Sequence, residues 1–304
     1  MARLPNAAVG DAYTSTYAYD LLEDLVDIGN RMAGQEGETE GAQRVAESFR
    51  EVGLRNVHLD EFEIPGWWRG RSSLVVDGPS GRTCEADHEV IALPGSPSGE
   101  ATADLVDVGH GRPTDFEEAD LDGAVAMASS ATPDDYGRWI HRMEKYCYAI
   151  DNGAVGFVFR NHIDGCLPPT GEVGYNNRPG PIPAVGVSKE VGAALERDAA
   201  DGAEVTLDVD CRNEPTTSRN VSGELGPDTD EVVLLTAHVD AHDIAPGAND
   251  NGAGTVLVAE VARLLKRVED DLETRVRCVV FGSEEIGLRG AYHLAETIDL
   301  DAVK

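Results

Sequence analysis

Two short apolar runs separated by one helical segment constrain the fold more than any other feature of this sequence. The runs Val232–Thr236 and Arg277–Phe281 have the length of strands, and Gly254–Leu265 between them carries apolar residues at helical spacing. Short apolar runs joined through a helix are typical of parallel strands that are buried on both faces. A further helix is predicted over Leu288–Ala295, so we expect this part of the chain to form an α/β sheet.

The region before residue 93 is assigned to the same domain as the strands and helices near the C-terminus. A chain of 304 residues is expected to hold about two domains. We therefore predict one domain made of residues 1–92 and 206–304. The patterns in its N-terminal part predict two helices, one at Tyr17–Met32 and one that ends at about Val52. They also predict two strands, at Val57–Ile64 and Ser73–Val76.

The middle of the chain has a different pattern, with short strand signals separated by turns rich in Gly and Pro. Residues 93–205 have the size of a small separate domain, and we expect them to form a mixed α+β module inserted into the first domain. The elements predicted in this module are strands at Asp104–Val108, Ala124–Ala128, Val155–Arg160 and Ala184–Val187 and helices at Asp135–Asn152 and Lys189–Ala199.

The charge balance excludes several classes of partner. The chain has 25 Lys and Arg against 56 Asp and Glu, a formal net charge of −31. A surface this negative repels phosphate backbones and anionic lipid headgroups, so we expect neither a nucleic acid nor a membrane as partner. Only four of the cationic residues are Lys. Excess carboxylate with scarce Lys fits a halophilic protein, whose self-repulsion is screened by salt, better than an ordinary acidic protein.

The cysteines indicate a reducing compartment. The chain has five cysteines, an odd number that cannot all pair internally, and they show no C-x-x-C spacing. The N-terminal residues contain no apolar signal-peptide core, and no stretch approaches the roughly 18 apolar residues of a membrane span. The sequence therefore predicts a cytoplasmic location.

Side chains that can bind a metal follow both predicted strands near the C-terminus. His238 and Asp240 follow the first strand, and Glu284 and Glu285 follow the second. If the strands are parallel neighbours, their carboxyl ends bring these side chains to one edge of the sheet, where α/β proteins bind ligands. Imidazole with carboxylates is a ligand set for a divalent cation, zinc first. Because no cysteine lies nearby, a structural Cys-rich site is excluded, and we expect a site of catalytic type.

Asp250 lies between the two strands, at the start of the predicted helix. Gly252 and Gly254 allow the chain to turn sharply from Asp250 into that helix without a Cβ clash. A carboxylate near a helix N-terminus is favoured by the helix dipole. Asp240, two residues beyond His238, is placed to accept the second imidazole N–H and so to orient the ring.

The acidic pair and the remaining histidines can also be explained without a function. Adjacent acidic pairs should occur about ten times by chance in a composition this acidic. Eight are present, so Glu284-Glu285 gains weight only from its position after a buried strand. His242 has a weak claim as a residue of the pocket, and His293, on a helix, is expected to be structural.

Three motifs together resemble the M28 family of di-zinc exopeptidases: His238-x-Asp240, Gly247-Ala-Asn-Asp250-Asn-Gly-Ala-Gly254 and Glu284-Glu285-x-Gly-Leu-x-Gly290. The segment Asn30-Arg-Met-Ala-Gly-Gln-Glu-Gly resembles the opening helix pair of that family. The spacing between the first His and the Asp resembles the branch that contains carboxypeptidase Q and its aminopeptidase relatives. The middle module resembles a protease-associated (PA) domain, through Gly153-Ala-Val-Gly-Phe-Val and Ile182-Pro-Ala-Val-Gly-Val-Ser.

The M28 resemblance implies a fold, a metal centre and a substrate. The fold would be a three-layer sheet of mostly parallel strands flanked by helices. With two zinc ions bound, His238 would ligate one, Asp250 would bridge both and Glu285 would ligate the second. Glu284 would be the general base and Asp240 would orient His238. The substrate would be a peptide, cut at its terminal bond.

The resemblance leaves the activity open between three alternatives. We expect an aminopeptidase. A carboxypeptidase that acts on dipeptides would use the same metals, and a non-catalytic M28-like binding scaffold is the alternative from another class. The intact set of metal-site residues favours an enzyme.

The sequence departs from the family pattern in one respect. The family supplies two further ligands, an Asp and a His, after the Glu-Glu motif, whereas only 19 residues follow Glu285 here. We therefore expect the chain to be an inactive fragment of a longer protein rather than a degenerate family member. The unpaired sheet edge of a fragment invites association, so a homo-oligomer is a further expectation.

Overall fold

The computed structural model describes residues 4–77, 81–176 and 178–304, which form two compact units. The first unit contains the chain up to Gly66 and the segment Pro215–Lys304, and the second unit is Trp67–Glu214. Two long strands, β1 (Arg55–Asp77) and β10 (Glu204–Leu225), run from one unit into the other. The domain limits predicted at residues 93 and 205 stay a prediction.

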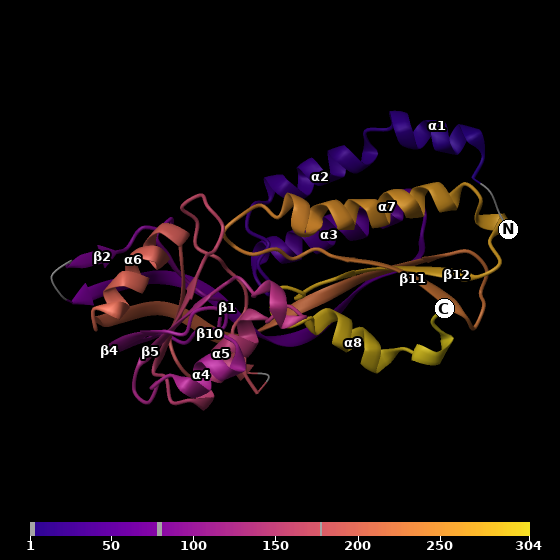
Figure 1. The fold of residues 1–304 in the computed structure, drawn as a ribbon. Helices are drawn as coiled ribbons and strands as arrows, with labels where there is room; N and C mark the ends of the chain where they lie inside the picture. The colour runs from indigo at the N-terminus through magenta and orange to yellow at the C-terminus, as the bar shows by residue number, and fades with distance from the viewer. Residues whose placement is uncertain (1–3, 78–80, 177) are drawn as a thin grey trace. The chain divides into compact units, whose positions relative to one another are not determined.

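The first unit is built on parallel strands β11 (Val232–His238) and β12 (Arg275–Phe281), as the apolar runs predicted. The C-terminal half of β10 pairs with β12 in the antiparallel sense, through Val221–Leu225. In Figure 1 the helices α2 (Tyr17–Asp27), α3 (Glu36–Val52) and α7 (Ala253–Lys266) lie on one side of these strands, and α8 (Arg289–Thr297) lies on the other. Helix α1 (Asn6–Thr14) belongs to the same unit.

The core of the first unit lies between the strands and the helices α2, α3 and α7. Leu25 of α2, Phe49 of α3 and Ala259 of α7 are fully buried, and they pack with Val221 and Cys278 of the strands. This packing holds α7 against β11, and so determines where the turn before α7 meets the end of that strand.

In the second unit the strands β4, β5, β6 and β9 run parallel in that order. The first half of β10 pairs antiparallel with β4, and β3 pairs antiparallel with β9. Figure 1 shows α6 on one side of these strands, and α4 and α5 on the other. The elements are β2 (Arg82–Cys84), β3 (Val90–Ala92), β4 (Gly99–Asp107), α4 (Pro113–Glu118), β5 (Val125–Ser129), α5 (Arg142–Asp151), β6 (Gly156–Arg160), β7 (Gly174–Tyr175), β8 (Arg178–Pro179), β9 (Ala184–Val187) and α6 (Lys189–Ala200).

The fold is mixed α/β, and its sheet is mixed rather than mostly parallel. The expectation of mostly parallel strands is corrected by β10, which runs antiparallel to both β12 and β4. We predicted two strands within Val57–Val76, but the chain forms one long strand, β1, which pairs with β10. Gly70 permits this pairing, because a Cβ there would lie 1.8 Å from the carbonyl oxygen of Asp210.

Two predicted helices are shorter than expected, and in both a glycine accounts for the difference. The first ends at Asp27 instead of Met32, because Gly29 adopts a left-handed backbone with φ of 80°. The helix predicted from Asp135 begins at Arg142, because Gly137 also has φ of 80° and ends a short 3₁₀ turn. Among the described residues, no helix combines the length and the apolar character needed to cross a bilayer.

Candidate metal centre

The two predicted strands end side by side, as expected. In the parallel pairing of β11 with β12, His238 lies opposite Phe281. His238 is the last residue of β11, and Glu284 and Glu285 follow Phe281 after two residues. The carboxyl ends of the strands therefore deliver an imidazole and two carboxylates to one edge of the sheet.

His238 is the buried residue on which the other groups converge. Its Nε2 atom lies 3.2 Å from Oδ1 of Asp250 and 3.7 Å from Oε2 of Glu284. Its Nδ1 atom lies 3.1 Å from the backbone carbonyl oxygen of Asp240. Since a carbonyl only accepts, Nδ1 must carry a proton to make this hydrogen bond, and in the neutral ring the lone pair is then on Nε2, the atom that faces the carboxylates. This is the tautomer that can ligate a metal through Nε2.

Asp240 is fully buried and holds the neighbouring turn through its carboxylate. One oxygen accepts a hydrogen bond from the backbone N–H of Glu284 and the other from that of Glu285, both at 3.0 Å. The carboxylate oxygen nearest His238 is 3.5 Å from Nδ1, farther than the backbone carbonyl of the same residue. Asp240 therefore contacts His238 through its main-chain carbonyl and, at a longer distance, through its carboxylate, which also positions the two glutamates.

Asp250 reaches the cluster from the turn that precedes α7. The turn Ala248–Gly252 leads directly into the helix, so the carboxylate lies close to the helix N-terminus, as predicted. Both glycines of this region lie where a side chain has no room. A Cβ at Gly252 would lie 2.9 Å from Leu22, and one at Gly254 would lie 2.0 Å from Asn251. The side chain of Asp250 is 74% exposed, so it can face a ligand.

The charges around the cluster shift two pKa values upward. Burial lowers the pKa of His238, but the carboxylates of Asp240, Glu284 and Glu285 outweigh burial and raise it to about 9. Burial raises the pKa of Glu284, the His238 imidazole opposes that rise, and three carboxylates including Asp250 add to it. Burial is the first cause for Glu284, but negative charge contributes to both shifts, and a bound cation would neutralise that charge.

Three donors in this cluster can hold a metal ion. One ligand atom each of His238, Asp250 and Glu285 lie within 4.8 Å of one another. The 3.2 Å between the donors of His238 and Asp250 is close to the roughly 3.3 Å that separates two donors of one tetrahedral zinc ion. The residues present therefore fit zinc, and they are the three that the sequence predicted as ligands.

His242 belongs to the cluster although the sequence assigned it only a weak claim. Its Nε2 atom lies 3.0 Å from Oε2 of Glu285. The sequence signal that could have identified His242 as a residue of the site is its position four residues after His238, on the same loop. His293 lies elsewhere, as expected for a structural residue: it hydrogen-bonds Asp60 at 3.0 Å and stacks on the ring of Phe62.

Arg31 is a further residue that the sequence patterns did not assign. It is fully buried, and its guanidinium donates to the carbonyl oxygens of Val239, Pro246, Gly247 and Leu25. Three of these carbonyls belong to the loop that joins His238 to Asp250. A guanidinium presents five donors in a fixed fork, so this one side chain can fix the path of the whole loop.

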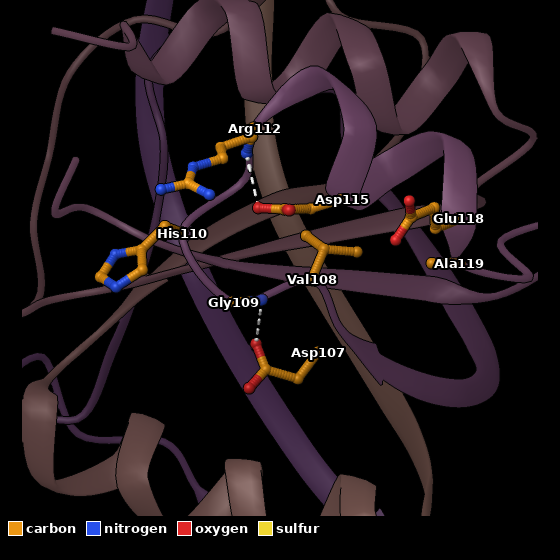
Figure 2. Close-up of a pocket in the computed structure, with 8 residues that line it drawn as sticks. All are labelled: Asp107, Val108, Gly109, His110, Arg112, Asp115, Glu118 and Ala119. Atoms are coloured by element: carbon orange, nitrogen blue, oxygen red, sulfur yellow. Dashed lines mark hydrogen bonds between the residues drawn. The ribbon is translucent and has the colours of Figure 1, made fainter. Parts of the chain in front are cut away.

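The second unit contains a hollow of about 490 Å³, shown in Figure 2, whose lining includes Asp107, His110, Arg112, Asp115 and Glu118. Two of its carboxylates are occupied by local backbone groups. Asp107 accepts from the N–H of Gly109 at 2.9 Å, and Asp115 accepts from the N–H of Arg112 at 2.8 Å. These contacts stabilise loops, so the strand-end cluster is the stronger candidate site.

Comparison with known proteins agrees with the motifs at the strand ends. Residues 220–304 match the model of peptidase family M28, and residues 101–195 match that of the PA domain. Aminopeptidase YwaD of Bacillus subtilis is 32% identical over 296 residues, which are 96% of this chain and 60% of that protein. Carboxypeptidase Q of Mus musculus is 26% identical and matches 94% of this chain and 62% of its own length.

Solved structures give the same result. The structure of BSAP, a zinc aminopeptidase from Bacillus subtilis, aligns with a TM-score of 0.73 and 30% identity, and covers 100% of this chain and 69% of its own. A peptidase M28 precursor from Shewanella amazonensis aligns with a TM-score of 0.77 and 26% identity, covering 96% of this chain and 69% of its own. The chain spans about 60% of the length of the curated relatives that it matches.

Proposed function

The chain belongs to peptidase family M28 and carries a PA domain, and on this premise we propose that it provides the metal centre of a zinc-dependent exopeptidase, acting as an aminopeptidase. The observation that supports this most directly is the convergence of His238, Asp250 and Glu285 within 4.8 Å, beside Glu284. For the first domain we also propose the three-layer arrangement of the family, since helices lie on both sides of β11 and β12.

In the proposed centre His238 would hold one zinc ion, Glu285 would hold the second, and Asp250 would be shared by both. Zinc bound there would supply a water of lowered pKa and a positive charge for the oxyanion. Among the side chains, Glu284 is placed to take a proton and to return it to the leaving amine, because its carboxylate lies in the first turn beyond β12 and 3.7 Å from Nε2 of His238. Burial raises the pKa of Glu284 and so suits it to this exchange.

The relatives favour a substrate with a free amino terminus. Aminopeptidase YwaD is 32% identical and BSAP, a zinc aminopeptidase, is 30% identical, whereas carboxypeptidase Q is 26% identical. The carboxylates of Glu284, Glu285, Asp240 and Asp250 do not decide between the two ends of a peptide, because bound zinc would offset their charge. We therefore propose the aminopeptidase over the dipeptide carboxypeptidase.

The test uses the longest natural form of the protein in the presence of zinc and compares its activity on three kinds of peptide substrate. We expect the protein to hydrolyse aminoacyl anilides and to lose this activity when the amino group of the substrate is acetylated. We expect hydrolysis to be unaffected when the C-terminus of the substrate is blocked. Cleavage that requires a free C-terminus would instead show the carboxypeptidase. Two bound zinc ions with no hydrolysis of any peptide would show the binding scaffold.

The 304-residue chain by itself is proposed to bind zinc incompletely and to lack activity. Counting Asp250 for both ions, each would have two protein ligands here, His238 with Asp250 and Asp250 with Glu285, whereas catalytic zinc sites usually have three. Calorimetric titration with zinc measures this. Tight binding of two ions per chain together with peptidase activity would refute it, and would point to His242 as a further ligand.

Three expectations about the cellular setting remain proposals. A cytoplasmic location is supported by the five cysteines, all of which are free. Adaptation to salt is supported by the net charge of −31. Association into a homo-oligomer would be measured by light scattering as the mass of the particle in solution.

A further inference from the structure

Buried side chains accept hydrogen bonds from four consecutive backbone N–H groups of the turn that carries Glu284 and Glu285. Asn220 accepts from the N–H of residue 282 at 3.2 Å, and Asp240 accepts from the N–H groups of both glutamates at 3.0 Å. The remaining N–H, that of Ser283, donates to Oε1 of Glu38 at 3.0 Å. Glu38 comes from α3, 245 residues earlier in the sequence.

Glu38 is fully buried and accepts three hydrogen bonds. Besides the N–H of Ser283, it accepts from the hydroxyl of Ser218 at 2.6 Å and from the N–H of Gly34 at 2.8 Å. The fit around its carboxylate is close, because a Cβ at Gly282 would lie 2.7 Å from Oε1. Burying a carboxylate is costly, so its three donors indicate a specific role. Burial and the nearby Asp240 raise the pKa of Glu38 to about 7.

Ser283, the residue that Glu38 holds, has an unusual backbone. Its φ is 53°, in the left-handed region that residues with a Cβ rarely adopt, and it is fully buried. The reversal at this residue turns the chain from β12 into the two glutamates that face His238. A conformation of this kind persists only where the surroundings hold it, and here the acceptor of Glu38 does so.

We propose that Glu38 is a positioning residue of the metal centre, which holds Ser283 in its left-handed conformation and thereby places Glu284 and Glu285 against His238. Its effect on zinc binding follows from geometry alone, whereas its effect on catalysis rests on the proposed function. If Glu38 only joined α3 to the sheet, its replacement would loosen α3 and β12 as much as the turn that carries Glu284 and Glu285.

The test replaces Glu38 by Gln and uses Glu40→Gln as the matched control. Both residues lie on α3, but Glu40 is exposed. A Gln keeps one acceptor oxygen and presents an NH₂ group to a backbone N–H, so it cannot satisfy both Gly34 and Ser283. We expect at least tenfold faster hydrogen exchange at the amides of residues 283–285. We also expect a zinc Kd about 10–100-fold weaker by calorimetry. Glu40→Gln should match the wild type in both measurements.

A second variant tests whether Glu38 acts through Ser283. Glycine adopts a positive φ at no steric cost, so adding Ser283→Gly to Glu38→Gln should recover part of the lost zinc affinity. Unchanged exchange and zinc affinity in Glu38→Gln would overturn the proposal. So would a loss of protection spread evenly over α3 and β12, or a Glu38→Gln chain that fails to fold and is not restored by Ser283→Gly. If the longest natural form of the wild-type protein binds zinc but hydrolyses no peptide, the proposed function alone is refuted.

Discussion

Adjacent glutamates at the end of β12 have different neighbours, and this separates their roles at the scale of single residues. Oε2 of Glu284 lies 3.7 Å from Nε2 of His238, while Oε2 of Glu285 lies 3.0 Å from Nε2 of His242. Glu285 shares the group of donors with His238 and Asp250, which supports the ligand role that we propose for it. Glu284 stands beside that group, which supports the proton-transfer role that we propose for it.

Two substitutions in the longest natural form of the protein distinguish these roles. Glu285→Ala removes a donor and should lower the zinc content of the protein, measured by elemental analysis. Glu284→Gln keeps the shape of the side chain but cannot accept a proton as a base, so it should retain zinc and lose kcat by about 10²–10⁴-fold. Equal loss of zinc in both variants would contradict this division.

The buried carboxyl of Glu38 should make stability depend on pH. Burial raises its folded-state pKa from 4.5 to about 7, Asp240 adds to the rise, and Ser218, Gly34 and Arg219 oppose it. Between these two pKa values the folded state binds more protons than the unfolded state, so this group lowers stability as pH increases. The unfolding free energy of Glu38→Gln minus that of the wild type should therefore increase by roughly 2–3 kcal/mol as the pH rises from 5 to 8.

Urea unfolding at the two pH values, with salt held constant, measures that gain. Glu40→Gln provides the control, because Glu40 is exposed on the same helix and its replacement should leave the pH dependence unchanged. A constant difference between Glu38→Gln and the wild type at both pH values would show that the Glu38 pKa is not raised.

At the scale of elements, α8 is joined to the metal-site turn by contacts that leave no room for a side chain. The N–H of Gly290 donates to the carbonyl oxygen of Gly282 at 3.1 Å, and the side chain of Asn220 donates to the carbonyl of Gly290 at 2.8 Å. A Cβ at Gly290 would lie 2.3 Å from Oδ1 of Asn220 and 2.4 Å from the carbonyl oxygen of Gly282. The start of α8 and the turn that carries Glu284 therefore move together.

Two glycine substitutions in helices should have opposite effects. Gly290→Ala should destabilise the protein by about 3 kcal/mol, because α8 must shift away from the turn. Gly10→Ala in α1 should stabilise it by about 0.5–1 kcal/mol, because the added Cβ meets nothing within 4 Å and alanine favours the helix. Denaturant unfolding measures both. Equal effects of the two substitutions would contradict the close approach at Gly290.

At the scale of the whole molecule, self-repulsion is the dominant feature. A net charge of −31 leaves many carboxylates without a cationic partner, since only 25 Lys and Arg face 56 acidic residues. The Debye length falls from about 10 Å at 0.1 M salt to about 3 Å at 1 M, so repulsion between surface carboxylates is strong only at low salt. Repulsion of this kind destabilises the compact state.

The melting temperature should therefore rise as KCl increases into the molar range. Thermal unfolding followed by circular dichroism measures this rise. A parallel series in sucrose serves as control, because sucrose strengthens burial without screening charge. A melting temperature that responds to sucrose but not to KCl would refute adaptation to salt.

The amino-acid sequence by itself determined the strands and helices that carry the site, and the residues that we propose as its ligands. Apolar runs and helical periodicity are local patterns, so β11, α7 and β12 could be predicted within a few residues. His238, Asp250 and Glu285 could be predicted because each follows or precedes such an element at a strand end or a helix start.

The tertiary structure alone decided what holds those ligands in place. The contacts of Arg31 with the loop before Asp250, of Glu38 with Ser283, and of His242 with Glu285 join side chains through space, the first two across more than 200 residues. The length of β10 and its antiparallel pairing with β12 and β4 were also decided there. Local patterns carry no record of such partners, because a buried Glu or Arg is stabilised by groups that only the folded chain brings within hydrogen-bonding distance.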